Sequence, residues 1–162
     1  MEDKKMTIWG IGPVLIALCA IVTIIGICIS HKKFLAVGRI PQIKIIMIVL
    51  GILLIALGVF IYFLTVVKSK MVENITETHL ITSGVYAWTR NPLYAAWGMV
   101  FTGIILIQNN LFLVVVLAVI WLLMTTLIPK EEKILEKIFG EEYLQYKRRV
   151  NRCIPWFPKH ID

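Results

Sequence analysis

Four long apolar runs constrain the fold of this chain more than any other feature of its sequence. No Asp, Glu, Lys, Arg or His lies in the interior of these runs, which cover residues 8–29, 43–67, 92–107 and 111–128. An α-helix rises about 1.5 Å per residue, so about 20 residues cross a hydrocarbon core of about 30 Å. The pattern therefore predicts an all-α integral membrane protein with four transmembrane helices.

Composition leads to the same fold class. Of the 162 residues, 59% are hydrophobic, and the mean hydropathy is +0.83. Soluble domains are typically nearer half apolar, so a soluble domain is excluded. The third and fourth runs are short and only residues 108–110 separate them, so we expect a tight final helical hairpin. A chain of this length has room for one compact bundle.

The basic residues predict how the bundle is oriented. Lys4 and Lys5 precede an apolar stretch of about 22 residues that lacks a small-x-small exit, which favours a retained span over a cleaved signal peptide. With four spans, the N-terminus, the loop 68–90 and the C-terminal segment share one side and hold 13 of the 17 Lys and Arg residues. That side is expected to be cytoplasmic. Four basic residues in the first loop argue the other way: Lys32, Lys33, Arg39 and Lys44.

Several functions are disfavoured by what the sequence lacks. Transporters and proton relays usually bury an ionisable residue at membrane depth, and the interiors of the runs contain none. The three cysteines and three histidines show no metal-ligand spacing, so no metal site is predicted. The net charge of +7 is explained by basic segments that bind anionic lipid, without nucleic acid. The chemistry is therefore expected at the membrane surface.

The loop before the third run carries two local signals. Ser83 and Gly84 mark a turn where the backbone can approach a ligand closely. Asn91 and Pro92 predict a helix start, because Asn is a favoured N-cap and Pro suits the first helical position. Arg90 beside that helix N-terminus is consistent with an anion-binding site. The enrichment of arginine in cytoplasmic loops is an equally simple explanation for this residue.

Aromatic residues crowd the same boundary. Tyr86, Trp88, Tyr94 and Trp97 all lie within a few residues of the predicted helix start. They fit an interfacial aromatic belt, and electron-rich rings at this position could also attract a cationic ligand. Both explanations remain open from the sequence.

Two C-terminal amphipathic helices are predicted on the cytoplasmic side. The first runs from Pro129 to residue 139 and ends at Gly140. Adjacent side chains on a helix point about 100° apart, so at most one of Glu131 and Glu132 can face a given ligand atom. The second covers residues 141–150, with Tyr143, Tyr146 and Val150 on one face.

Two blocks together resemble a known family. LITSGVYAWTRNPLYAAWG and, about thirty residues later, EEKILEKIFGEEYLQYKRRVNRCIP resemble the C-terminal half of the isoprenylcysteine carboxyl methyltransferase family and, more distantly, the phospholipid N-methyltransferases. The resemblance covers about residues 79–155. It implies that S-adenosylmethionine is bound at the cytoplasmic membrane face. Residues 1–70 then supply two transmembrane helices, and residues 71–162 form the catalytic region.

The resemblance also implies site residues. Arg90 and Glu132 are the implied catalytic residues. The implied cofactor-binding residues are Leu80, Gly84, Val85, Tyr86, Arg90, Asn91, Pro92, Tyr94, Glu131 and Glu132.

Two positions depart from the family pattern. Asn91 replaces a histidine of the usual Arg-His-Pro, and its amide can still donate and accept hydrogen bonds. Lys130 stands near where the carboxyl methyltransferases often carry an arginine, and lysine lacks the planar fork that grips a carboxylate.

The expected activity is methyl transfer to a lipophilic small molecule or prenylated substrate within membrane lipid. An ionised carboxylate needs only alignment, whereas an ammonium must first lose a proton, which favours carboxyl O-methylation. Phospholipid or amine N-methylation is the alternative. A non-catalytic membrane protein that retains a cofactor-like site is an alternative of another class.

Overall fold

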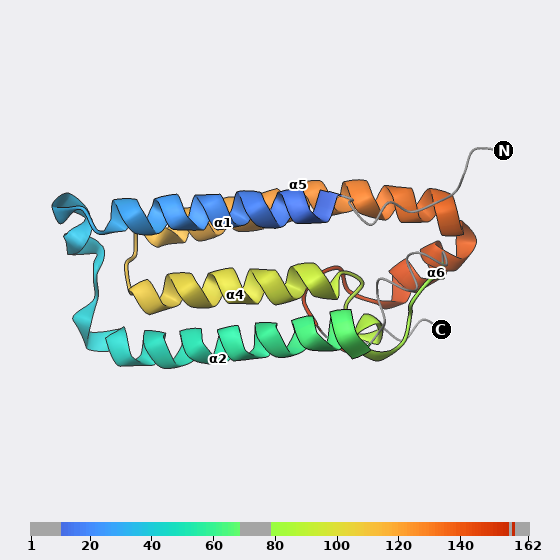
Figure 1. Ribbon diagram of the computed structural model, residues 1–162, viewed down its shortest axis with the longest axis horizontal. Helices are drawn as coiled ribbons and strands as arrows, with labels where there is room; N and C mark the ends of the chain where they lie inside the picture. Colours follow the sequence, from blue (N-terminus) through green and yellow to red (C-terminus); the bar gives the residue numbers. More distant parts are fainter. Residues whose placement is uncertain (1–10, 69–78, 156, 158–162) are drawn as a thin grey trace.

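Helices form nearly all of the regular structure. The computed structural model describes residues 11–68, 79–155 and 157, and in those ranges it contains helices and two isolated β-bridges but no strand (Figure 1). The longer helices are α1 (Ile11–Ser30), α2 (Lys44–Phe63), α4 (Pro92–Gln108), α5 (Leu113–Phe139) and α6 (Glu141–Arg149). The shorter ones are η1 (Lys33–Gly38), η2 (Pro41–Ile43), η3 (Leu64–Lys68) and η4 (Gly84–Ala87). The all-α prediction is confirmed.

Three helices are long and apolar enough to cross a membrane. They cover Ile11–Ser30, Pro41–Lys68 and Leu113–Phe139, and α4 is a shorter apolar helix. Most of their large apolar side chains point outward, including Ile24, Ile45 and Val115, which are more than half exposed. Such an apolar surface is suited to contact with lipid. The backbone N–H and C=O groups are hydrogen-bonded within each helix, so they do not need water. The chain is thus a membrane protein, and its described residues contain three helices of spanning length where four spans were predicted.

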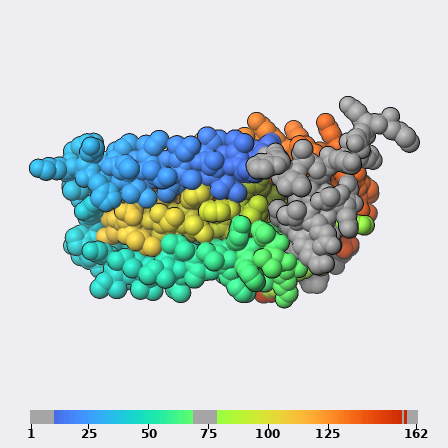
Figure 2. All heavy atoms as spheres, viewed as in Figure 1, coloured from blue at the N-terminus to red at the C-terminus, as the bar shows by residue number. Residues whose placement is uncertain are grey.

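The four long helices lie side by side in two pairs. Contacts are most extensive between α2 and α4, and then between α1 and α5. Figure 2 shows α1, α4 and α2 in turn across one face. The core between them is built around Leu15, Tyr94, Phe101 and Met124. The start of α1, the end of α2, the start of α4 and the end of α5 all lie at the same end (Figure 1).

Small residues bring α2 and α4 together. A Cβ atom added to Gly103 would lie 2.5 Å from the carbonyl oxygen of Gly51, and one added to Gly58 would lie 2.6 Å from that of Ala96. Glycines at such crossings let helix backbones approach closely in a membrane.

The predicted tight hairpin between α4 and α5 is confirmed. Asn109 takes a left-handed conformation with φ 45°, which asparagine tolerates better than most residues. The Asn110 side chain then accepts from the N–H of Phe112 and donates to the carbonyl of Leu35. The turn is therefore fixed both to the start of α5 and to η1.

The prediction of a separate helix starting at Pro129 is wrong. Helix α5 continues through Pro129 to residue 139. Proline removes one backbone hydrogen bond and usually kinks or ends a helix. Here Ile128 and Glu132, on either side of it, are each 1% exposed and anchored in the bundle, which holds the helix together. The predicted end at Gly140 is confirmed, with φ 57° and ψ −128°.

Candidate functional site

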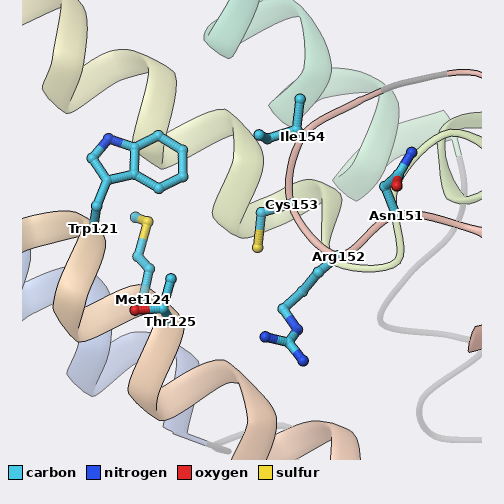
Figure 3. Close-up of a pocket in the computed structure, with 7 residues that line it drawn as sticks. All are labelled: Trp121, Met124, Thr125, Asn151, Arg152, Cys153 and Ile154. Atoms are coloured by element: carbon cyan, nitrogen blue, oxygen red, sulfur yellow. The ribbon is translucent and has the colours of Figure 1, made fainter.

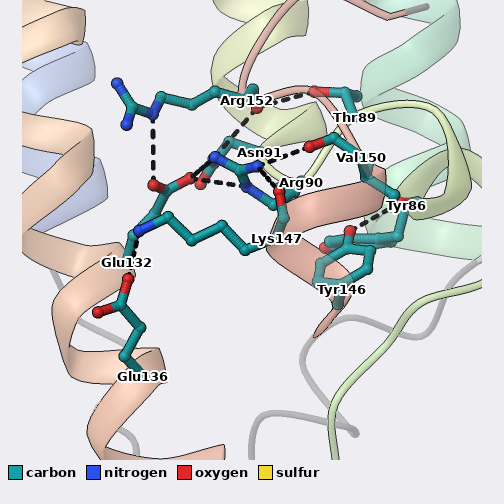
Figure 4. Close-up of polar contacts among 10 residues, drawn as sticks. All are labelled: Tyr86, Thr89, Arg90, Asn91, Glu132, Glu136, Tyr146, Lys147, Val150 and Arg152. Carbon is teal, nitrogen blue, oxygen red and sulfur yellow. Dashed lines mark hydrogen bonds and ion pairs between the residues drawn. The ribbon is translucent and has the colours of Figure 1, made fainter. Parts of the chain in front are cut away.

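The carboxylate of Glu132 is the centre of a buried polar network where three segments meet. Its Oε1 accepts from Nε of Arg90 and from Nδ2 of Asn91, both at 3.0 Å, and its Oε2 accepts from Nε of Arg152 at 3.3 Å (Figure 4). Glu132 itself is 1% exposed. A buried carboxylate is tolerated only when it is paired and hydrogen-bonded in this way.

Arg90 ties the same network to the end of α6. One of its terminal nitrogens donates to the carbonyl oxygens of Lys147 at 2.7 Å and Val150 at 2.6 Å, and the other pairs with Glu132 at 3.0 Å. A guanidinium at a helix C-terminus also complements the helix dipole. The Arg90 side chain is 7% exposed, and protein groups occupy most of its donors.

Backbone contacts join the same two stretches of sequence. The N–H of Arg90 donates to the carbonyl of Asn151 at 2.8 Å, and the N–H of Asn91 donates to that of Arg152 at 3.0 Å. The Thr89 hydroxyl also donates to the Arg152 carbonyl, at 2.9 Å. These two stretches, about sixty residues apart in the sequence, are therefore held together by main-chain hydrogen bonds as well as by charge.

Asn91 does not act as the side-chain cap that the sequence predicted. It precedes α4, and Pro92 is the first helical residue as expected, but its side chain makes no capping hydrogen bond. Its Nδ2 donates instead to Glu132 and to the carbonyl of Arg152. These two donations, one of them to a charged acceptor, fix the orientation of the amide, and this explains why its oxygen does not cap α4.

Glu131 has a different set of partners from its neighbour. Its Oε1 accepts from the N–H of Gly12 at 3.0 Å, and its Oε2 accepts from the Tyr94 hydroxyl at 2.6 Å. It thereby satisfies one of the unpaired N–H groups at the start of α1. The two adjacent glutamates therefore face different groups of the protein.

The loop residues that the resemblance implied lie elsewhere. Leu80, Gly84 and Val85 line a hollow of about 780 Å³ that Lys68 and His79 also border. Gly84 has φ 64°, a conformation that favours glycine. The structure thus brings Arg90, Asn91 and Glu132 together, and Tyr94 with Glu131, while these three loop residues border a separate hollow.

A second hollow, of about 440 Å³, lies beside the network (Figure 3). Helix α5 and the segment after α6 line it with Trp121, Met124, Thr125, Asn151, Arg152, Cys153 and Ile154. The sequence pattern predicted none of these seven as site residues. Arg152 and Cys153 lie within the second block of the resemblance, but no spacing pattern in the sequence marks them as site residues.

The tyrosines of α6 form a buried patch against the η4 loop. Tyr146 donates its hydroxyl to the carbonyl of Tyr86 at 2.7 Å. Burial raises the pKa of Tyr86 to about 12, and it raises the pKa values of Tyr143 and Tyr146 above the ordinary value of 10. The Tyr143 hydroxyl is buried without a hydrogen-bond partner among the described residues.

Cys153 is held as a neutral thiol. Its pKa is raised to about 12, mainly by burial and also by nearby Glu132, while Arg152 and Arg90 oppose the rise. A thiol with this pKa is neither a nucleophile nor a base at neutral pH.

The predicted aromatic cluster is divided among several contacts. Trp97 stacks on Phe101 and meets Tyr62 edge-on, and the ring of Trp88 lies 5.0 Å from that of Phe157. In the part of the chain that the structure describes, no ring contact joins any two of Tyr86, Trp88, Tyr94 and Trp97. This arrangement favours packing over an aromatic cage.

Comparison with known proteins places the chain among methyltransferases. The profile of the family described as phospholipid methyltransferase matches residues 46–142. Curated relatives named protein-S-isoprenylcysteine O-methyltransferase include those of Mus musculus, 40% identical over 83 residues, and Saccharomyces cerevisiae, 34% identical over 120 residues. These alignments cover 50% and 67% of this chain, but only 29% and 48% of the relatives. No solved structure matches the chain significantly.

Proposed function

Because the chain belongs to the phospholipid methyltransferase family, we propose that it is an integral membrane methyltransferase that uses S-adenosylmethionine and acts on a lipophilic substrate. The proposed reaction is carboxyl O-methylation of the isoprenylcysteine type, after the names of its relatives. The observation that carries the proposal is the convergence of Arg90, Asn91 and Arg152 on Glu132. It joins the two blocks beside a hollow lined by the middle of α5 and by the segment after α6.

The polar groups around the network fit the cofactor. S-adenosylmethionine would supply a methyl group made electrophilic by its bond to a positively charged sulfur. The buried Tyr143 hydroxyl, which lacks a hydrogen-bond partner among the described residues, offers an unused polar group near Arg90 and Glu132. At the other hollow, Gly84 leaves the backbone accessible between Leu80 and Val85. The proposed cofactor-binding residues remain those that the resemblance implied.

The chain's own residues would mainly position the reactants. The carboxylate of Glu132 is 1% exposed and paired with two guanidinium groups, so it is not placed to take a proton from an acceptor. The neutral thiol of Cys153 cannot take one either. An ionised carboxylate needs no base, whereas an ammonium does, so this site suits a carboxylate acceptor better. We assign Arg90 and Glu132 the task of fixing the geometry between α4, α5 and the C-terminal segment.

The proposed topology has four membrane helices, with α4 as a short fourth span. The helix ends nearest the network would then face the cytoplasm, as the basic residues predicted. Residues 1–70 would supply two spans, and residues 71–162 would supply the catalytic region with its C-terminal amphipathic helices. A cytoplasmic site reached from the bilayer suits a membrane-anchored or prenylated substrate.

A non-catalytic protein with a cofactor-like site is the second candidate. One observation favours it: protein groups occupy both oxygens of Glu132 and most donors of Arg90. Such a protein could bind the cofactor without transferring its methyl group, so binding and turnover must be measured separately.

Calorimetry on the detergent-purified full chain tests the cofactor proposal. We expect saturable binding of S-adenosylmethionine and S-adenosylhomocysteine, lost in Glu132→Gln and kept in Glu136→Gln. Glu136 is the matched control because its carboxylate pairs with the Lys147 ammonium at a partly exposed position and is not a hydrogen-bond or ion-pair partner of Arg90, Asn91 or Arg152 among the described residues. If the folded wild-type protein binds neither compound, the methyltransferase proposal is rejected.

A further inference from the structure

Arg152 lies between the Glu132 network and the hollow of about 440 Å³. We propose that Arg152 determines acceptor specificity by binding the carboxylate of a lipid-linked acid whose apolar chain occupies that hollow. This inference rests on the proposed function and adds to it the residue that selects the substrate.

The charges around Glu132 do not cancel. One buried carboxylate is paired with two guanidinium groups, those of Arg90 and Arg152, which leaves one positive charge in excess. Arg90 is enclosed, with a side chain 7% exposed, whereas the side chain of Arg152 is 41% exposed. The excess charge is therefore presented by Arg152.

The donors of Arg152 are only partly used. Its Nε donates to Oε2 of Glu132 at 3.3 Å, which sets the plane of the guanidinium. Its two terminal nitrogens have no hydrogen bond or ion pair with any residue that the structure describes, and they point away from the labelled partners in Figure 4. A planar guanidinium held at one nitrogen can offer its other donors to a carboxylate, a geometry that lysine cannot supply.

The hollow beside this guanidinium suits a hydrocarbon chain. Figure 3 shows Trp121 and Met124 of α5 on one side and Cys153 and Ile154 on the other. Its volume lies within the range of about 300–1,000 Å³ typical of small-molecule sites. Ile154 is 64% exposed, so the hollow opens at the molecular surface.

The position along α5 supports entry from the bilayer. Trp121 precedes Glu132 by 11 residues, so it lies about 16 Å farther along the helix, toward the middle of a span. An acceptor with its carboxylate at Arg152 would thus place its chain at membrane depth. A cationic ammonium head would meet the excess positive charge and be repelled.

Binding measurements without the methyl donor test the inference directly. The full chain in detergent is titrated with a prenylated cysteine that bears a free carboxylate, with its carboxamide, and with a prenyl phosphate, and tryptophan fluorescence is followed. We expect the wild-type protein to bind the carboxylate tenfold to hundredfold more tightly than the carboxamide, in line with one charge-assisted pair. Arg152→Gln should abolish this preference and Arg152→Lys should keep part of it.

Arg148→Gln is the matched control, because Arg148 is an exposed arginine of α6 outside the network. It should bind both compounds as the wild-type protein does. Equal wild-type affinity for carboxylate and carboxamide would overturn the inference, as would a preference that survives in Arg152→Gln. Tighter binding of the prenyl phosphate would also overturn it and would identify a lipid phosphate as the occupant.

The same variants separate this inference from the proposed function. With labelled S-adenosylmethionine, Arg152→Gln should raise KM for the acceptor at least tenfold, whereas Arg148→Gln should leave this KM unchanged. Wild-type turnover with an unchanged KM in Arg152→Gln would refute the role of Arg152 alone. Carboxylate-selective binding without any turnover would refute the methyltransferase and leave Arg152 as the binding residue.

Discussion

At the scale of single residues, the site is organised by one buried carboxylate. The Glu132 carboxylate accepts hydrogen bonds from Arg90 and Asn91, which precede α5 in the sequence, and from Arg152, which follows it. The desolvation of such a charge is costly, so the surrounding donors are needed for folding as well as for any chemistry. Removing the charge would leave two guanidinium groups without their shared partner.

We therefore expect Glu132→Gln to destabilise the protein strongly. Breaking a buried ion pair by removing one partner costs about 3–5 kcal/mol. Glu136→Gln removes a half-exposed pair with Lys147 and should cost about 1 kcal/mol or less. Thermal unfolding of both variants in one detergent measures the contrast. Equal unfolding midpoints would show that the Glu132 network does not stabilise the fold.

The sequence indicates some residues of the network and not others. The resemblance indicated Arg90 and Glu132, and the structure joins them directly. It did not single out Arg152, because a basic residue near a membrane boundary is explained equally well by lipid contact. Only the path of the chain after α6 shows that this arginine, unlike Arg148, reaches the carboxylate.

At the scale of helices, tertiary packing determines whether a helix continues where local sequence propensity favours a break. The sequence predicted the start of α4 at Pro92 and the end of α5 at residue 139. It failed at Pro129, where proline chemistry favours a break but the buried positions on both sides keep α5 continuous. Tertiary contacts of this kind cannot be deduced from local sequence alone.

Two glycines of α4 give a matched test of helix packing. Alanine at Gly103 would place its Cβ 2.5 Å from the carbonyl oxygen of Gly51, so α2 and α4 must separate. We expect Gly103→Ala to destabilise the protein by about 1–3 kcal/mol. At Gly98 the nearest atom would be Sδ of Met124 at 3.4 Å, an ordinary contact. Gly98→Ala should be neutral or stabilise by up to about 1 kcal/mol. Denaturation in mixed detergent gives both values, and the reverse order would contradict the packing.

The tyrosines of α6 predict a dependence on pH. Burial raises the pKa of Tyr86 to about 12 and the pKa values of Tyr143 and Tyr146 above 10, so folding favours their neutral hydroxyls. Their contribution to stability is complete below about pH 10 and is lost as pH rises toward about 12 and beyond. Tyrosinate absorbance should therefore rise together with loss of helical circular dichroism. Titration of all tyrosines near pH 10 without loss of structure would contradict this.

At the scale of the whole molecule, two helix pairs hold a polar network at one end of an apolar bundle. The sequence predicted the all-α membrane class and the hairpin, because apolar runs and helix boundaries are local signals. It could not predict which helices pair, since α2 with α4 and α1 with α5 depend on contacts between distant residues. The hollow beside Arg152 arises from that same arrangement.

We propose that this bundle transfers methyl groups to a lipid-linked carboxylate. The most direct test incubates the purified protein in lipid nanodiscs with S-adenosylmethionine labelled in its methyl group, a prenylated cysteine and an amine phospholipid. We predict label on the prenylated cysteine that base releases as methanol, because the product is a methyl ester. Base-stable label on the amine lipid, or no transfer by a folded protein, would rule out carboxyl methylation by this protein.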